Sequence, residues 1–347
     1  MDGRSDLDEL RVLEIGTLTL FKPVYPESTT WLCPAPMPEK RGCADPPPPF
    51  VGWNEFTKIK QRLLSGAYDL VVYLVPGVLR RFSRWWWKDF IRERLCHHQA
   101  VKTLLREVRG MPIAVLDMGD AGPLNPANIP LLDCCRAYFK RELPAEPAEL
   151  LSAPGAAATI NASHNSASAT SRLAKLRTIS VGLCRERIAA APATTLEKKV
   201  GVFFAGCVRN LAIRRRGLSC LLSLRKKGVV VDVAEGLPIE EYMKRCAQAW
   251  LVWSPEGLGR DCFRHYEAPL CRSVPVINQA PVVRHRPLIN GTHCFYYEDQ
   301  GNDLARVILG ALSDKARPIQ MAEQARAHVL EHHTHEALCR YITEEIL

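Results

Sequence analysis

Residues 249–277 read AWLVWSPEGLGRDCFRHYEAPLCRSVPVI, and this segment indicates the fold class most clearly. An apolar run at 249–253 is followed by a tight loop with two glycines, then by a helical pattern at 261–271 and a second apolar run at 274–277. Continuous apolar runs of this length, separated by a helix, are typical of buried strands in a parallel sheet. The stretch therefore predicts a strand–loop–helix–strand unit of an α/β domain.

The same alternation extends outward on both sides of this stretch. It predicts two Rossmann-like α/β domains facing a cleft, because repeated strand–helix–strand units build doubly wound parallel sheets. In the first half we expect strands at 10–20, 69–75 and 112–117 and helices at 55–64 and 86–108, with the segment 175–183 returning to close the first domain. In the second half we expect strands at 200–205 and 229–233, and helices at 215–226, 238–246 and 304–312.

A chain of 347 residues exceeds what one core usually supports, which also favours two domains. We expect a first domain over residues 1–183, in which the Ala-, Ser-, Asn- and Pro-rich stretch 145–171 forms a flexible loop. We then expect a linker at 184–199, a second domain at 200–325, and a C-terminal helix at 326–347 that packs back on the first domain.

Composition narrows the class of protein without identifying a function. The net charge of +9 favours anionic partners, among which nucleotide diphosphates, nucleic acid and acidic lipid headgroups stay open. The 13 cysteines are odd in number and irregularly spaced, which favours free thiols over zinc sites or disulfides. The sequence contains no apolar run of membrane-spanning length, and its start is acidic rather than signal-like, so we expect a cytoplasmic protein.

Two expected strand ends carry residues suited to an anionic ligand, since ligands of open α/β sheets bind beyond the carboxyl ends of strands. After the first, Gly206 allows close backbone approach, and Arg209, Asn210 and Arg214–Arg216 follow at a helix start. Arginines in that position suit a diphosphate, although a solvated basic helix start gives the same pattern.

The second position is the glycine loop of the opening stretch. Pro255, Gly257 and Gly259 form the loop, and Arg264 and Glu267 lie three residues apart on one face of the following helix. The carboxylate can accept hydrogen bonds from the two hydroxyls of a ribose, and the guanidinium can pair with phosphate. The combination of loop, charged helix face and following strand is more specific than a glycine loop alone.

These residues resemble a known family. The pattern P-x-G-x-G-x-D-x-x-R-x-Y-E-A at 255–268, followed by VPVI, is similar to the C-terminal signature of GT-B glycosyltransferases, in particular the exostosin-like and CgeB-like group. Supporting similarities are FFAG at 203–206, EGLP at 235–238 before Glu241 and Tyr242, HHT at 332–334 and YFKRE at 138–142. The resemblance is dense over residues 200–340 and sparse over residues 1–110.

The resemblance implies a nucleotide-diphosphate sugar as co-substrate, with a UDP-sugar favoured. It assigns Glu267 to the ribose, Arg264 and Arg215 to the diphosphate, and the loop from Glu256 to Gly259 to the sugar or its phosphate, which makes Glu256 a candidate catalytic residue. Ten residues separate the two glutamates, whereas many retaining members have seven between them, so the stereochemistry stays open.

The first domain offers weaker candidates for acceptor chemistry. Asp120 follows the strand at 112–117 and is the candidate general base of an inverting transfer, although a loop aspartate that caps the next turn fits equally. Lys140 and Arg141 are candidate contacts for an anionic substrate, or else the edge of a solvated helix.

Residues 80–88 read RRFSRWWWK, in which basic and aromatic side chains alternate. Arg84 and Trp86 are candidate acceptor contacts, because such segments can stack bases and bind phosphates, lie on a membrane surface, or simply join a loop to a helix.

His332, His333 and His335 suggest a metal site, but no neighbouring carboxylate or cysteine completes an obvious one. No DxD motif follows an expected strand either, so we expect no obligatory metal.

The sequence thus predicts an enzyme that transfers a sugar from a nucleotide-diphosphate sugar to a hydroxyl acceptor. A glycosyltransferase that acts on a modified nucleic-acid base, such as a hydroxymethylated pyrimidine, is one alternative. A non-catalytic nucleotide-sugar or nucleic-acid binding protein with the same fold is another. The identity of the acceptor and the oligomeric state are left open by the sequence.

Overall fold

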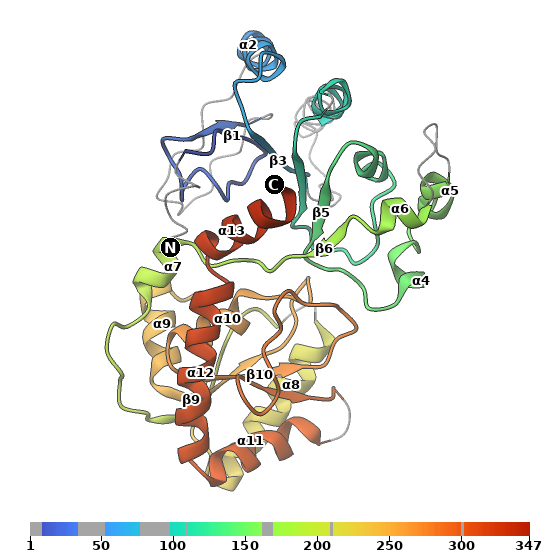
Figure 1. Ribbon diagram of the computed structural model, residues 1–347. Coiled ribbons are helices and arrows are strands. Elements are labelled where there is room, and N and C mark those ends of the chain that lie inside the picture. Colours follow the sequence, from blue (N-terminus) through green and yellow to red (C-terminus); the bar gives the residue numbers. More distant parts are fainter. Residues whose placement is uncertain are drawn as a thin grey trace, which may run out of the picture. The chain divides into compact units, whose positions relative to one another are not determined.

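The computed structural model describes residues 9–33, 53–76, 98–108, 110–161, 169–208, 211–299 and 302–347, and the chain divides into two compact units (Figure 1). Unit 1 comprises Met1–Ile179 and Cys339–Leu347, and unit 2 comprises Ser180–Leu338. Each unit is built on one parallel sheet, which confirms the predicted fold class of two Rossmann-like domains. The cleft that we expected stays a prediction.

The sheet of unit 1 has six strands in the order β2-β1-β3-β4-β5-β6, and every neighbouring pair is parallel. The order places the carboxyl ends of all six strands at one edge. The bounds are β1 Val12–Ile15, β2 Thr29–Leu32, β3 Leu70–Leu74, β4 Ile113–Asp117, β5 Ala137–Lys140 and β6 Leu176–Thr178.

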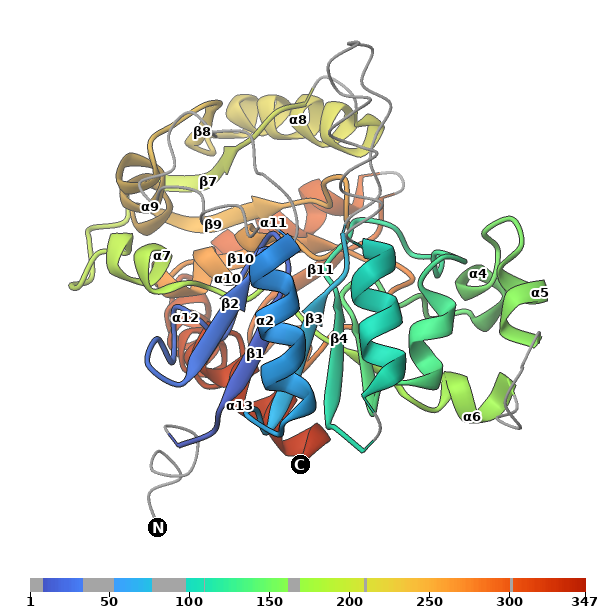
Figure 2. The same cartoon turned by 90° about the horizontal axis from the view of Figure 1, so that it is seen from above.

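Helices of unit 1 lie along its sheet, as Figure 2 shows for α2 (Trp53–Leu64). Phe56, Ile59 and Leu63 recur with helical spacing and are buried in the same core as the strands, which is why this segment is a helix. Residues 98–107 form the second half of the helix expected at 86–108, and the earlier part of that segment lies outside the described residues.

The flexible loop expected at 145–171 is wrong in the described part of that segment. Three short helices occur there, α4 Pro147–Leu150, α5 Ala156–Asn161 and α6 Ala169–Leu173. Ala156 and Ile160 are buried in the core of unit 1, and Arg172 donates from Nε and Nη2 to the two carboxylate oxygens of Asp133, at 2.7 Å each. Small side chains allow these helices to pack closely against the 3-10 helix at Ile129–Asp133, so low hydrophobicity here does not mean disorder.

The sheet of unit 2 has five parallel strands in the order β11-β10-β9-β7-β8. Strands β7 and β9 are therefore neighbours at its centre. The strands are β7 Val200–Ala205, β8 Val231–Ala234, β9 Ala249–Ser254, β10 Val274–Asn278 and β11 Phe295–Tyr297. The helices are α7 Arg185–Ala190, α8 Ala212–Leu224, α9 Ile239–Ala247, α10 Phe263–Leu270, α11 Asp303–Ser313 and α12 Ala316–His332, with a 3-10 helix at Arg225–Lys227.

The sequence of the C-terminal segment fits one long helix or two, and the structure has two. Helix α12 ends at His332, and α13 spans His335–Ile346. Residues Cys339–Leu347 belong to unit 1. There the Tyr341 ring meets Phe139 edge-on at 5.5 Å between centroids, and Arg177 Nε donates to Glu345 at 2.6 Å. This end of the chain therefore completes the core of the first unit.

Within the described ranges, no helix combines the length and the apolar character that crossing a membrane requires.

Candidate functional site

The carboxyl edge of the unit 2 sheet holds the first cluster of candidate residues. Strand β7 ends at Ala205 and is followed by Gly206, and strand β9 ends at Ser254 and is followed by the loop 255–262. Because β7 and β9 are paired and parallel, these two loops leave the sheet side by side. Helices α8 and α10 start just beyond them, so their first turns face the same edge.

Two guanidinium groups converge on Gly206. A Cβ placed on this glycine would lie 3.5 Å from Arg214 Nη1 and 3.4 Å from Arg264 Nη1, so both arginines reach the same point. Arg214 is in the first turn of α8 and Arg264 in the first turn of α10. Backbone amides and the positive end of the helix dipole add to the positive potential there.

Backbone carbonyls hold both guanidiniums in place. Arg214 donates from Nη1 to the carbonyl of Cys207 at 2.8 Å and from Nε to that of Glu256 at 3.0 Å. Arg264 donates from Nη2 to the carbonyl of Pro255 at 3.1 Å. The two side chains are thus fixed before any ligand binds, which lowers the entropic cost of binding.

Within the described part of the chain, neither guanidinium forms an ion pair with a carboxylate. Arg214 is 8% exposed, and burial lowers its pKa, with the charge of Arg264 as the next cause. Two neighbouring cations that destabilise each other gain most from a doubly charged anion, since an opposite charge removes both the repulsion and part of the desolvation cost. This edge is accordingly a candidate anion site.

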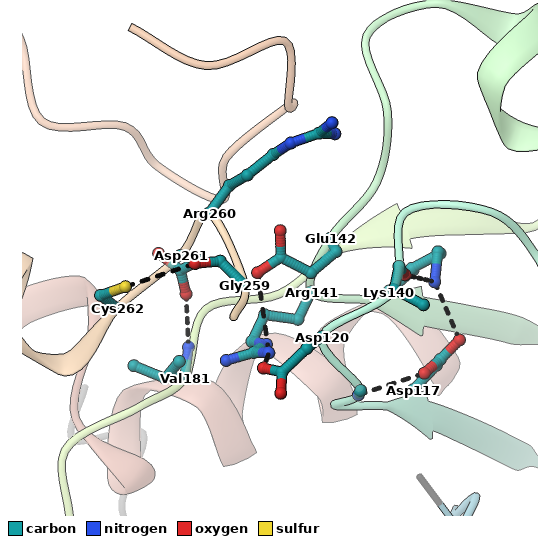
Figure 3. A network of polar contacts seen from close by, with 12 residues as sticks. Asp117, Asp120, Lys140, Arg141, Glu142, Val181, Gly259, Arg260, Asp261 and Cys262 are labelled. Carbon is teal, nitrogen blue, oxygen red and sulfur yellow. Dashed lines mark hydrogen bonds and ion pairs between the residues drawn. The ribbon is translucent and has the colours of Figure 1, made fainter. Parts of the chain in front are cut away.

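The glycines of the loop are required by this packing. A Cβ on Gly257 would lie 2.9 Å from Arg214 Nη2 and 3.5 Å from Cys262 Sγ. The Gly257 amide donates to the Gly259 carbonyl at 2.8 Å, and Cys262 Sγ lies 3.4 Å from the same oxygen (Figure 3). The loop therefore folds back on itself beneath the guanidinium.

Buried side chains anchor the end of this loop. The Asp261 carboxylate accepts from the Val181 amide at 2.9 Å and from the Tyr266 hydroxyl at 2.6 Å (Figure 3). His265 Nδ1 lies 2.7 Å from Ser254 Oγ, and its Nε2 donates to the Arg260 carbonyl at 3.1 Å. Burial holds the pKa of His265 well below its usual value, so the ring is neutral and serves to position the loop.

Glu256 is held by Asn278, a residue that the sequence analysis missed. The Asn278 side chain accepts from the Glu256 amide at 2.7 Å and donates to Glu256 Oε2 at 3.2 Å. Asn278 is the last residue of β10, so it stands at the same carboxyl edge. A polar residue that directly follows the apolar run 274–277 is the signal that could have identified it.

Glu267 lies one turn beyond Arg264 on α10 and is 3% exposed. Its carboxylate forms an ion pair with Arg187, whose guanidinium lies 4.1 Å from the centre of the Phe263 ring. Arg187 belongs to α7, in the segment that we expected to be a linker. The Arg187–Phe263 stack thus supplies the counter-charge that a buried carboxylate needs.

The carboxyl edge of the unit 1 sheet holds a second, separate cluster. Lys140 Nζ donates to Asp117 Oδ2 at 3.0 Å and to the Ala121 carbonyl at 2.8 Å, and the Tyr138 hydroxyl donates to the same carboxylate oxygen at 3.1 Å (Figure 3). Lys140 is only 1% exposed. It is therefore not on a solvated helix edge, because it is the last residue of strand β5 and pairs with Asp117.

Asp120 lies in the loop that follows β4, and its side chain is 49% exposed. It forms an ion pair with Arg141, which also lies 3.6 Å from Glu142 Oε1 (Figure 3). Arg141 is buried, and its guanidinium faces these two carboxylates. The ion pair holds the Asp120 carboxylate in a fixed orientation at the sheet edge.

The structure describes only some of the other residues that the sequence predicted for the site. Arg215 is exposed on α8, and the structure places its neighbour Arg214 at the two loops in its stead. Arg209, Asn210, Arg84 and Trp86 lie outside the described residues. The role of each residue named for the site stays a prediction.

Among the described residues, no group of three or more histidine, cysteine, aspartate or glutamate side chains is arranged to hold a metal ion. The 11 cysteines in these ranges are all free thiols. Whether catalysis needs a metal stays open, since a metal can also be carried by a substrate diphosphate.

Solved structures with a similar fold cover nearly the whole chain. An α-glucosyltransferase in complex with UDP-glucose and DNA containing an abasic site matches at 10% identity and a TM-score of 0.57, over 96% of this chain and 98% of that one. A glycosyltransferase from Rickettsia africae matches at 9% identity and a TM-score of 0.54, over 97% of both chains. Sucrose-phosphate synthase from Thermosynechococcus elongatus matches at 10% identity and a TM-score of 0.51, over 96% and 98%.

No protein-family model matches the chain, and no curated protein matches its sequence. At these identities the structural likeness shows the fold alone. The chain has the fold of the GT-B glycosyltransferases, with two α/β domains on parallel sheets.

Proposed function

We propose that the chain is a glycosyltransferase that binds a nucleotide-diphosphate sugar in unit 2 and transfers the sugar to a hydroxyl acceptor. The observation that carries this proposal is the pair Arg214 and Arg264. Both reach Gly206 at the carboxyl edge, and neither has a carboxylate partner in the described part of the chain. A diphosphate matches that site in charge, because it offers two neighbouring anionic groups.

In this proposal the donor is held along the edge of the unit 2 sheet. The two arginines and the amides around Gly206 bind the diphosphate, and Glu267 accepts hydrogen bonds from the ribose hydroxyls. The loop from Pro255 to Gly259, with Glu256 fixed by Asn278, contacts the sugar. A UDP-sugar is the favoured donor, since solved structures with this fold were determined in complex with UDP or UDP-glucose.

The chemistry requires stabilisation of the diphosphate as it leaves with the bonding electrons of the sugar. Preorganised guanidiniums can supply this, because they already point at the position where negative charge develops. Arg214 and Arg264 are held by backbone carbonyls and need little reorganisation. We propose that they take the role that a divalent metal has in other glycosyltransferases.

We propose that unit 1 binds the acceptor and that Asp120 receives the proton of its hydroxyl. The partial exposure of Asp120 at the end of β4 supports this role. The ion pair with Arg141 orients the carboxylate. The placement of the chain in the exostosin-like and CgeB-like group is part of the same proposal, and it rests on the pattern at residues 255–268.

A nucleic-acid acceptor is the second candidate. Its support is the α-glucosyltransferase fold neighbour, which was solved in complex with UDP and DNA containing an HMU base, together with the net charge of +9 of this chain. Excess positive charge gives a protein long-range attraction to the phosphate backbone. Transfer of labelled sugar to DNA with hydroxymethylated bases, compared with unmodified DNA, distinguishes this acceptor from others.

Calorimetric titration with UDP tests the donor site. We expect Arg214→Gln to weaken UDP binding about 10- to 100-fold, since a hydrogen bond to a charged group contributes about 1.5–3 kcal/mol. Lys226→Gln is the matched control, because it removes one positive charge from an exposed position of the same unit. Equal affinity of the Arg214 variant and the control would refute the diphosphate site.

Turnover separates an enzyme from a binding protein. Release of UDP from a panel of UDP-sugars without added acceptor is expected at a slow rate in the wild-type chain, because water can replace the acceptor. The Arg214→Gln variant should lose this release. A chain that binds UDP tightly but releases none from any sugar donor would support the non-catalytic alternative.

A further inference from the structure

Five histidines gather in one part of unit 2, which is half of the ten in the sequence. The rings of His293 and His328 are stacked at 4.5 Å, those of His328 and His332 lie 4.7 Å apart, and those of His285 and His333 lie 5.9 Å apart. His285 and His293 come from the loop 279–294 after β10, and the other three from the end of α12 and the residue that follows it. We refer to these five residues as the histidine cluster.

The histidine cluster holds the loop 279–294 by two hydrogen bonds to one backbone carbonyl of that loop. His328 Nε2 and His333 Nε2 both donate to the Arg286 carbonyl, at 2.9 and 3.0 Å. Arg286 has a φ of 38°, in the left-handed region that non-glycine residues rarely adopt, so its carbonyl depends on these two donors for its position. His333 Nδ1 lies 3.0 Å from Ser180 Oγ, which fits a neutral ring that accepts there.

The same loop supports the candidate nucleotide site. Arg284 Nη2 donates to the Arg260 carbonyl at 3.2 Å, beside the bond from His265. The Nε atom of Arg284 is buried and has no hydrogen-bond partner in the described ranges, and its guanidinium lies 5.7 Å from the centre of the Tyr296 ring. A displacement of this loop would therefore remove one of the two donors that hold Arg260 in the loop 255–262.

The charges that face the cluster make protonation unfavourable. Glu331 forms an ion pair with one of these rings, 3.7 Å from His332 Nε2. Other titratable side chains around the cluster and its loop include Arg284, Arg286 and Arg317 from the loop and from α12, Cys294 from the loop, Tyr266 from α10 against His333, and Tyr296 from β11. The Asp261 carboxylate acts on Arg284.

Burial, followed by the neighbouring positive charges, lowers the pKa of His285 to about 4. The same causes lower the pKa of His293, His332 and His333. Rings with lowered pKa are neutral at pH 7.5 and resist protonation as the pH falls. Protons that do bind favour arrangements in which the rings separate and become solvated, since that relieves both burial and repulsion.

We propose that the histidine cluster makes nucleotide binding pH-sensitive, because protonation releases the loop 279–294 and with it the Arg284 support of the nucleotide loop. This inference rests on the proposed function and adds regulation of the same site. The state in which the histidines hold the loop 279–294 binds fewer protons than the state in which the loop is released. A lower pH therefore favours release of the loop and weakens nucleotide binding.

Titration of the wild-type chain with UDP at pH 7.5 and pH 5.5 measures this effect. We expect the dissociation constant to rise about tenfold at the lower pH, which is a typical coupling between two sites. The double variant His285→Gln, His333→Gln should keep the pH 7.5 affinity and lose most of the rise, because burial lowers the pKa of both rings. Glutamine at 333 can still donate to the Arg286 carbonyl but cannot take up a proton.

The control is the double variant Lys226→Gln, Lys227→Gln, which removes two charges from exposed positions of unit 2 and should keep the wild-type rise. The control also accounts for titration of UDP itself, which affects all variants equally. Where the double histidine variant does not fold, His332→Gln alone serves, because His332 makes no bond to Arg286.

Two results separate the failures of the two proposals. An equal rise in the wild-type chain and the histidine variant, or a flat wild-type response with UDP bound at both pH values, would overturn this inference alone. Absence of UDP binding to the folded wild-type chain at pH 7.5 would overturn the proposed function and, with it, this inference.

Discussion

Gly217 sets how closely helix α8 lies on the sheet of unit 2, and replacing it tests the packing beneath the nucleotide site. A Cβ on Gly217 would lie 2.0 Å from Trp253 Cζ2 and 2.4 Å from its Cη2. Ordinary contact begins near 3.4 Å, so the helix or the ring would have to move by about 1.4 Å. The ring has little freedom, because Trp253 Nε1 donates to the Tyr297 hydroxyl at 2.9 Å and the Phe204 ring lies 4.6 Å away.

We expect Gly217→Ala to destabilise unit 2. Overpacking of a core costs about 1–3 kcal/mol. The gain in helix propensity from glycine to alanine offsets up to about 1 kcal/mol of this. The net loss of about 1–2 kcal/mol should lower the Tm by about 2–8 °C for a unit of this size. UDP binding should weaken as well, because Arg214 lies one turn before Gly217 on the same helix.

Gly310→Ala is the matched control in thermal unfolding. Gly310 lies inside α11, and a Cβ there would meet no atom within 4 Å. Only the propensity gain remains, so this variant should be more stable than the wild-type chain by about 0.5–1 kcal/mol. A Gly217 variant that is as stable as the wild-type chain, or a Gly310 variant that loses as much stability, would refute the packing argument.

Two further predictions concern unit 1. Arg172→Met should lower the free energy of unfolding by about 3 kcal/mol in urea denaturation, because it breaks a buried ion pair with Asp133; a change below about 0.5 kcal/mol would mean that the segment 145–171 is not packed. Asp120→Asn should reduce sugar transfer about 100-fold or more while UDP affinity stays unchanged, as expected for loss of a general base. A fully active Asp120 variant would remove this residue from the mechanism.

Most strands and helices could be predicted from the sequence because their apolar residues follow the period of the element. Strands β3, β4, β7, β9 and β10 are fully or largely buried runs, and each was expected within one or two residues of its bounds. The short strands β2 and β11 were missed, since three or four partly exposed residues carry no clear period. Pairing with a neighbouring strand makes these segments extended, and pairing is not visible in a local window.

Strand β5 shows why a buried charged residue leads to a wrong prediction of solvent exposure. The segment around Lys140 and Arg141 suggested a solvated helix edge, because lysine and arginine are rarely buried. The structure neutralises Lys140 with Asp117, which ends the neighbouring strand β4. This compensation depends on the register between two strands 20 or so residues apart, and the sequence alone contains no information that fixes that register.

The difference between Arg214 and Arg215 has a geometric cause. Adjacent residues of a helix point about 100° apart, so the starting residue of α8 decides which of three consecutive arginines faces the sheet. We expected the helix to start at 215, whereas it starts at Ala212. The sequence therefore predicted arginines at this edge but assigned the wrong one, and boundaries are the least certain part of any such prediction.

The distribution of carboxylates around the unit 2 edge strengthens the case for an anionic ligand. Glu267 is paired with Arg187, Asp299 with Arg216, and Asp261 accepts from Val181 and Tyr266. Each nearby acid thus has a defined partner, and the acid closest in sequence to the loop, Glu256, is held by Asn278. Among the residues that the structure describes, the two central arginines donate to carbonyls, which satisfy hydrogen bonds without cancelling charge. Their positive charge is therefore left for a ligand, and two adjacent cations favour a diphosphate over a single carboxylate.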